Sequence, residues 1–184
     1  MKRGKKIVIV AHCFLNQNSR VRPSATTAGA FKKLIKPLME HDFGIIQLPC
    51  PETTCFGLDR WDSVTEQFDT AHYRRHCRSL LQPYVDQLEE HRRAGHKIYG
   101  CLGVPYSPSC ATQIHPTAKD WGGAVVNRQI DRPKRGQGPA VFMQEFMRMC
   151  AEIDLKIKFM DVSEVEGRLP DIQPEKILQD LLKG

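Results

Sequence analysis

Four short apolar segments constrain the fold of this chain more than any other feature. They lie at residues 6–11, 44–48, 97–104 and 157–162. Segments of this length that lack regular polar alternation are typical of strands buried on both faces of a parallel sheet. Because parallel neighbours need long crossover connections, we expect a helix between each strand and the next.

Helical periodicity is found between these segments. The spacing of apolar residues predicts helices over residues 24–40, 69–94, 138–153 and from Pro174 onward. Ser24 is expected to cap the first helix, and residues 105–135 are expected to be irregular. With no internal repeat or domain boundary, residues 1–184 are predicted to form a single α/β domain. Its mainly parallel sheet of about four strands is flanked by helices in a Rossmann-like arrangement.

Bulk properties exclude several classes of protein. No segment approaches the about 20 apolar residues needed to cross a bilayer, and the apolar run at residues 7–11 is too short for a signal peptide. We therefore expect a cytoplasmic location and no membrane partner. The net charge is +6, but basic residues are dispersed without interleaved aromatics, which argues against a nucleic-acid partner. Nothing in the sequence indicates an oligomeric state.

Three of the seven cysteines follow predicted strands. The odd number, in a chain without an export signal, argues against a disulfide framework. Cys13, Cys50 and Cys110 come after the first, second and third strands, respectively. The carboxyl ends of parallel strands share one edge of the sheet, which is where such sheets bind ligands. We therefore expect these three thiols to converge; the alternative is a coincidence of loop cysteines.

The other four cysteines have different surroundings. Cys77 and Cys150 lie on apolar helix faces and Cys101 lies inside the third strand, so we expect all three in the core. Cys55 follows Cys50 by five positions. It is a loop bystander, a fourth ligand or a redox partner.

Three converging thiolates are soft ligands that suit zinc or an iron–sulfur cluster. A structural zinc site needs four ligands, often in close CxxC pairs, and the chain has no such pair. Three ligands leave one coordination position open, as in a catalytic centre. In a [4Fe–4S] cluster they would leave one iron without a protein ligand, and that iron would be a Lewis acid with high affinity for sulfur.

Polar residues lie next to two of these cysteines. Glu52, in LPCPE, is a candidate general acid or base; the alternative is a helix-cap or surface carboxylate. Ser107 and Ser109 flank Pro108 in YSPSC, where a hydroxyl can relay a proton or hydrogen-bond a cluster sulfur, or simply form a turn. Of the two serines, Ser107 is favoured for a catalytic role.

The segments HCFLNQNSR, LPCPE and SPSC, in this order, resemble the thiouracil desulfurase (TudS) family. The stretches IIQLPCPE, GLDRW, EQFDT, HCRSLLQPYVDQ and GQGPAVFMQEF resemble its TudS-related desulfidase branch in particular, and the resemblance runs from Lys6 to Cys150. It implies an α/β domain that removes sulfur from the thiocarbonyl of a small thiolated compound, such as 2-thiouracil, without redox chemistry. It also implies site residues: a [4Fe–4S] cluster on Cys13, Cys50 and Cys110, with Glu52 and Ser107 as catalytic residues.

The sequence departs from the family pattern at two places. Ala111 follows Cys110 where the family has glycine, and alanine would be strained there if the position needs a positive φ. HCFLN stands in place of the CLLG of the thiouracil enzymes, which leaves the identity of the substrate open. The alternatives are a zinc-dependent hydrolase on the same three cysteines, a non-enzymatic iron–sulfur or sulfur carrier or redox sensor, and a module that binds thiolated RNA bases.

Overall fold

A four-stranded parallel sheet forms the centre of the protein. The structure is a computed structural model that describes residues 3–123, 126, 132–167 and 169–183. The sheet has the order β2-β1-β3-β6, and all three pairings are parallel. Its strands are β1 (Lys6–Val10), β2 (Phe43–Gln47), β3 (Lys97–Gly103) and β6 (Lys158–Asp161). The predicted α/β class and parallel sheet are confirmed.

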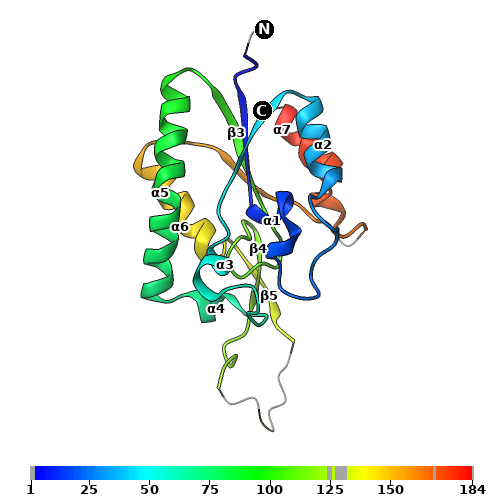
Figure 1. The fold of residues 1–184 in the computed structure, drawn as a ribbon, viewed down its shortest axis with the longest axis vertical. Coiled ribbons are helices and arrows are strands. Elements are labelled where there is room, and N and C mark those ends of the chain that lie inside the picture. The colour runs from blue at the N-terminus through cyan, green and yellow to red at the C-terminus, as the bar shows by residue number, and fades with distance from the viewer. Residues whose placement is uncertain (1–2, 124–125, 127–131, 168, 184) are drawn as a thin grey trace.

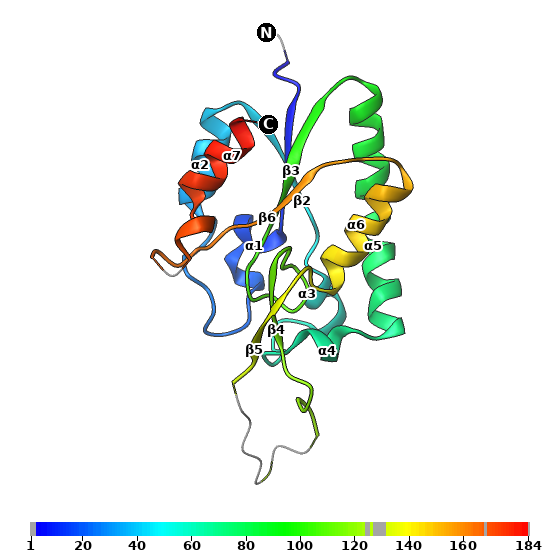
Figure 2. The ribbon, with the colours of Figure 1, turned by 180° about the vertical axis from the view of Figure 1, so that it is seen from behind.

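Helices cover both faces of the sheet in a Rossmann-like arrangement (Figure 1). On one side α5 (Ala71–Arg93) packs on α6 (Val141–Glu152), and on the other α2 (Lys32–Glu40) packs on α7 (Pro174–Leu182). The view from behind shows the same two pairs (Figure 2). Three cysteines predicted for the core are confirmed there, each with 1% or less of its surface exposed: Cys77, Cys101 and Cys150.

The first predicted helix starts later than expected. It begins at Lys32 rather than at Ser24. The preceding segment bonds to the loop after β1: Thr26 N donates to Gln17 Oε1 at 3.0 Å, and Gln17 N donates to Gly29 O at 3.0 Å. Because these groups bond elsewhere, they are not available for a helical hydrogen-bond ladder.

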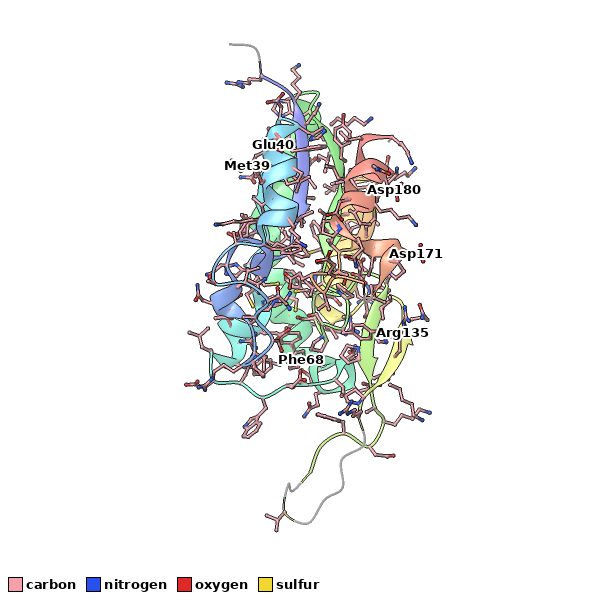
Figure 3. All side chains as sticks on the ribbon, turned by 90° about the vertical axis from the view of Figure 1, so that its right-hand side faces the viewer. Met39, Glu40, Phe68, Arg135, Asp171 and Asp180 are labelled. Atoms are coloured by element: carbon pink, nitrogen blue, oxygen red, sulfur yellow. The ribbon has the colours of Figure 1, made fainter. Side chains whose placement is uncertain are left out.

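The predicted irregular stretch contains a second, small sheet. Strands β4 (Ile114–Thr117) and β5 (Lys134–Gln137) pair antiparallel, so the expectation of irregular structure over 105–135 was wrong for residues 114–117 and 134–135. Close packing requires glycine in β5, because a Cβ at Gly136 would lie 2.1 Å from His115 Nε2. Residues 124–125 and 127–131 lie outside the described residues. In Figure 3, Arg135 of β5 lies toward the end of the molecule opposite Met39 and Glu40 of α2.

The remaining short elements lie in the loops that follow the carboxyl ends of the strands (Figure 1). These are α1 (His12–Leu15), a 3₁₀ turn (Gln17–Ser19), α3 (Pro51–Phe56), α4 (Thr65–Phe68) and a 3₁₀ turn (Pro170–Ile172). Strand order reverses between β1 and β3, because β2 lies beyond β1 and β6 lies beyond β3. Ligands of open parallel sheets bind at such a switch point. Among the described residues, no helix has the length and apolar character required to span a membrane.

Candidate functional site

A cavity of about 500 Å³ opens at this carboxyl edge. Its wall comes from the loops that follow all four strands of the main sheet. The five residues singled out in the sequence all line it: Cys13, Cys50, Glu52, Ser107 and Cys110. The fold therefore brings into one cavity side chains that are far apart in the sequence, as the strand-edge argument predicts.

Each of the three sulfurs has a polar N–H or O–H group close by. Cys13 lies in α1 directly after β1, Cys50 is the N-cap of α3, and Cys110 lies in the loop after β3. Arg20 donates to Cys13 at 3.7 Å and the Thr53 hydroxyl donates to Cys50 at 3.2 Å, while the Ser109 hydroxyl lies 3.5 Å from the Cys110 sulfur. Such donors stabilise the negative charge of a thiolate ligand.

Burial opposes ionisation of the Cys13 and Cys110 thiols. It raises the pKa of Cys13 to about 12, although the Arg20 guanidinium acts in the opposite direction. Burial also raises the pKa of Cys110 well above its ordinary value, with further contributions from Cys50 and Glu52. Three thiolates at such a place need a compensating positive charge, which a bound metal centre supplies because metal binding displaces thiol protons.

Glu52 lies in the wall as part of a buried polar chain. Ser109, whose surface is fully buried, donates a short hydrogen bond to Glu52 Oε1, and Arg60 Nε donates to Glu52 Oε2 at 2.8 Å. Ser107 Oγ lies 3.3 Å from Ser109 Oγ and accepts from Cys110 N at 2.9 Å. Of the two serines, Ser107 lines the cavity, whereas Ser109 contacts Glu52 directly. Glu52 is therefore not the surface carboxylate of the alternative interpretation.

Sequence reasoning missed Arg60, which fixes the position of Glu52. Its guanidinium also donates to Ser19 O at 2.7 Å and to Gly57 O at 3.1 Å. The side chains of Arg60 and Glu52 are only 7% and 10% exposed. The sequence signal that could have identified Arg60 is the segment GLDRW, which contains it. The family resemblance includes this segment but assigns it no role.

A second buried ion pair lies beside Cys13. Arg20 Nη2 lies 2.5 Å from Glu164 Oε2, and Gln17 Nε2 donates both to Glu164 Oε1 at 2.7 Å and to Cys13 O at 3.0 Å. Sequence reasoning missed Glu164. No local signal marked Glu164, which follows Gln17 by 147 positions.

The loop that carries Cys110 is anchored by Asp161 at the end of β6. The buried carboxylate accepts from the backbone N–H groups of Thr112, Gln113 and Ile114 at 2.6 to 3.0 Å. Ala111 is not among the described residues with positive φ, so alanine is unstrained where the family has glycine. The predicted strain at this position is therefore absent.

Cys55 packs against the core from α3 rather than lining the cavity. Within the part of the chain that the structure describes, no three His, Cys, Asp or Glu side chains are grouped so as to hold one metal ion. Cysteines that bind separate irons of a cluster stand further apart than the ligands of a single ion, because each sulfur approaches a different metal atom.

Comparison with known proteins identifies one curated relative. No family model matches the chain, and no solved structure matches it significantly. A protein of Methanocaldococcus jannaschii, named "Uncharacterized protein MJ0003", is 40% identical over 108 residues, which are 59% of this chain and 69% of the relative. At this identity and coverage, the chain belongs to the family of Uncharacterized protein MJ0003.

Proposed function

We propose that this protein is a desulfidase that replaces the sulfur of a thiocarbonyl with oxygen from water and uses a [4Fe–4S] cluster on Cys13, Cys50 and Cys110. The observation that carries the proposal is that three thiols and a buried carboxylate line one cavity at the carboxyl edge of a parallel sheet. The resemblance to the TudS family supports the same reaction and implies a small thiolated substrate.

The residues of the cavity fit such a cluster. Thiolates are the ligands that iron–sulfur clusters take, and each sulfur here has an N–H or O–H group within 3.7 Å. Protein hydrogen bonds to the sulfurs are one of the means by which proteins tune these clusters. When bound, the cluster would supply a Lewis-acidic iron with one position free for the substrate sulfur.

Glu52 and the two serines provide a path for protons. Ser109 donates to Glu52 Oε1, and the Ser107 hydroxyl, which lines the cavity, lies within hydrogen-bonding distance of Ser109. Glu52 as a carboxylate can accept a proton from water directly, or through Ser107 and Ser109 in turn. Arg60 balances the charge of the carboxylate and fixes its orientation.

The overall reaction needs no electron donor or acceptor. One water is consumed, the carbon–sulfur double bond is replaced by a carbon–oxygen double bond, and the sulfur leaves with the two water protons as hydrogen sulfide or, after losing one, as hydrosulfide. In this scheme Glu52 takes a proton from the water that attacks carbon and returns one to the departing sulfur or to a substrate nitrogen.

The role of Glu52 is tested by Glu52→Gln, with Glu66→Gln as the matched control. Glu66 is a carboxylate outside the cavity wall that bonds to Thr117. We expect Glu52→Gln to lose at least about 100-fold in sulfide release from a thiolated base while keeping its iron and acid-labile sulfide. Normal turnover of Glu52→Gln would remove the carboxylate from the mechanism.

Metal analysis of anaerobically reconstituted protein separates the alternatives. We expect about four irons and four sulfides per chain, and their loss in Cys13→Ala, Cys50→Ala and Cys110→Ala. Zinc without sulfide would instead favour a zinc-dependent hydrolase on the same cysteines. A cluster that passes to an acceptor protein, with no product from thiolated compounds, would favour an iron–sulfur carrier.

A further inference from the structure

We propose that Glu164 is a positioning residue, which holds the Arg20 guanidinium against the sulfur of Cys13. The proposal rests on the proposed function only for what Cys13 binds. The contact itself depends on the chain's own residues, which come from the loops after β1 and β6.

Glu164 is connected to Cys13 by two routes. Through Arg20 it reaches the sulfur, because the same Nη2 lies 2.5 Å from Glu164 Oε2 and 3.7 Å from Cys13 Sγ. Through Gln17 it reaches the main chain, because Gln17 Nε2 donates to both Glu164 Oε1 and Cys13 O. Thr26 Oγ1 donates to Glu164 Oε2 at 3.2 Å. Both carboxylate oxygens are therefore engaged.

The burial of this network argues for a role other than stability. The side chains of Arg20 and Glu164 are 15% and 3% exposed. Burying two opposite charges costs solvation that their attraction often does not recover, so such a pair is weak evidence of a stabilising contact. Its position against a candidate ligand sulfur gives it a function instead: it places a positive charge and an N–H donor at Cys13.

Arg20 depends on Glu164 for its orientation. Among the described residues, its buried Nε has no hydrogen-bond partner and its Nη1 makes a long contact of 3.4 Å to Ser24 O. The 2.5 Å contact with Glu164 is thus the shortest of its recorded contacts. Without it, the guanidinium would be free to turn toward the cavity and leave the sulfur.

The test is a double-mutant cycle of Arg20→Met and Glu164→Gln, with Glu166→Gln as control. Glu166 carries the same charge two positions away, but it pairs with Lys33 on the surface. We expect each single variant to lose iron to a chelator about tenfold faster than the wild type. The double variant should lose it no faster than Arg20→Met alone, and Glu166→Gln should match the wild type. The midpoint potential of the cluster should fall in Arg20→Met, because a positive charge and a hydrogen bond near a ligand sulfur are removed.

The same cycle is run on the protein without metal, by urea unfolding. Non-additive shifts in the urea midpoint are expected, because Glu164 acts through Arg20. Additive shifts, or iron loss and a potential equal to those of the wild type, would overturn the positioning role. A wild-type protein that assembles no iron and sulfide would instead overturn the proposed function, and the urea cycle would still decide whether Glu164 and Arg20 are coupled.

Discussion

The Arg60–Glu52 pair and the Arg20–Glu164 pair both lie in the wall of the cavity, but they differ in which member contacts the other candidate site residues. In the first, the carboxylate contacts Ser109 and the arginine holds it in place. In the second, the arginine contacts the Cys13 sulfur and the carboxylate holds it in place. Under the proposed function, the first pair would serve proton transfer and the second would position a cluster ligand.

The two pairs also differ in how the chain builds them. Glu52 and Arg60 are eight positions apart and belong to one loop region after β2. Arg20 and Glu164 come from the loops after β1 and β6, so only the assembled sheet brings them together. The Glu52–Arg60 contact therefore joins residues that are close in the sequence, whereas the contact between Arg20 and Glu164 depends on the assembled sheet.

Replacing Arg60 is expected to lower stability and turnover more than any other substitution, and Arg20 provides the comparison. Arg60→Met leaves the Glu52 carboxylate buried without its counter-charge, so we expect unfolding free energy to fall by about 4 kcal/mol and turnover by about 100-fold. Arg20→Met should cost less stability, because Glu164 keeps Gln17 and Thr26 as donors. Urea unfolding and sulfide release measure both quantities. Equal losses of stability and turnover in the two variants would show that the two arginines have equivalent roles.

Asp161 tests whether β6 supports both sides of the site. Asp161→Ala removes the acceptor of three backbone N–H groups after Cys110, and we expect it to lower unfolding free energy by about 3 kcal/mol. Asp180→Ala, at a more exposed side chain paired with Lys183 on α7, is the control and should change little. A loss of iron and sulfide binding in Asp161→Ala, along with the loss of stability, would show that β6 supports the Cys110 side of the site as well as the Cys13 side. Unchanged urea midpoints would show that the loop does not need this anchor.

The serines sharpen the assignment on the Glu52 side. Ser109→Ala removes the direct donor to Glu52, so we expect turnover to fall about tenfold, with a smaller loss in Ser107→Ala. Initial rates of sulfide release, normalised to iron content, show which of the two variants loses more activity. A larger loss in Ser107→Ala would assign the principal role to the serine that the resemblance implies.

The smallest effect is expected at a more exposed pair outside the cavity. The Arg74 hydrogen bond lowers the pKa of Asp69 below 3.8, although burial acts in the opposite direction. This stabilisation is present above pH 3.8 and is lost as the pH falls through the lowered pKa. Because the Asp69 side chain is 50% exposed, Asp69→Asn should cost only about 0.5 kcal/mol at pH 7. Urea unfolding of wild type and variant should converge at low pH; a difference that persists there would have another cause.

Much of the fold was predictable from local pattern. The four strands of the main sheet follow their apolar runs within one or two residues, because strands buried on both faces need continuous apolar sequence. The late start of α2 at Lys32 was not predictable, because the hydrogen bonds that prevent a helix from Ser24 come from Gln17, a residue of another loop. The β4–β5 pair was missed because β5 (KRGQ) is a polar, mostly exposed strand without an apolar signal.

The order of residues along the chain is enough to predict that the three cysteines and Glu52 meet. Cysteines placed after three successive strands of a parallel sheet must lie at one edge, and Glu52 follows Cys50 too closely to lie elsewhere. Which side chains support these four residues depends on the folded arrangement of the loops. Arg60 reaches Glu52 through a turn at Gly57, and Glu164 reaches Arg20 only because β6 pairs with β3. Such contacts depend on where side chains point after the strands have paired, and no periodicity or local spacing in the sequence encodes that.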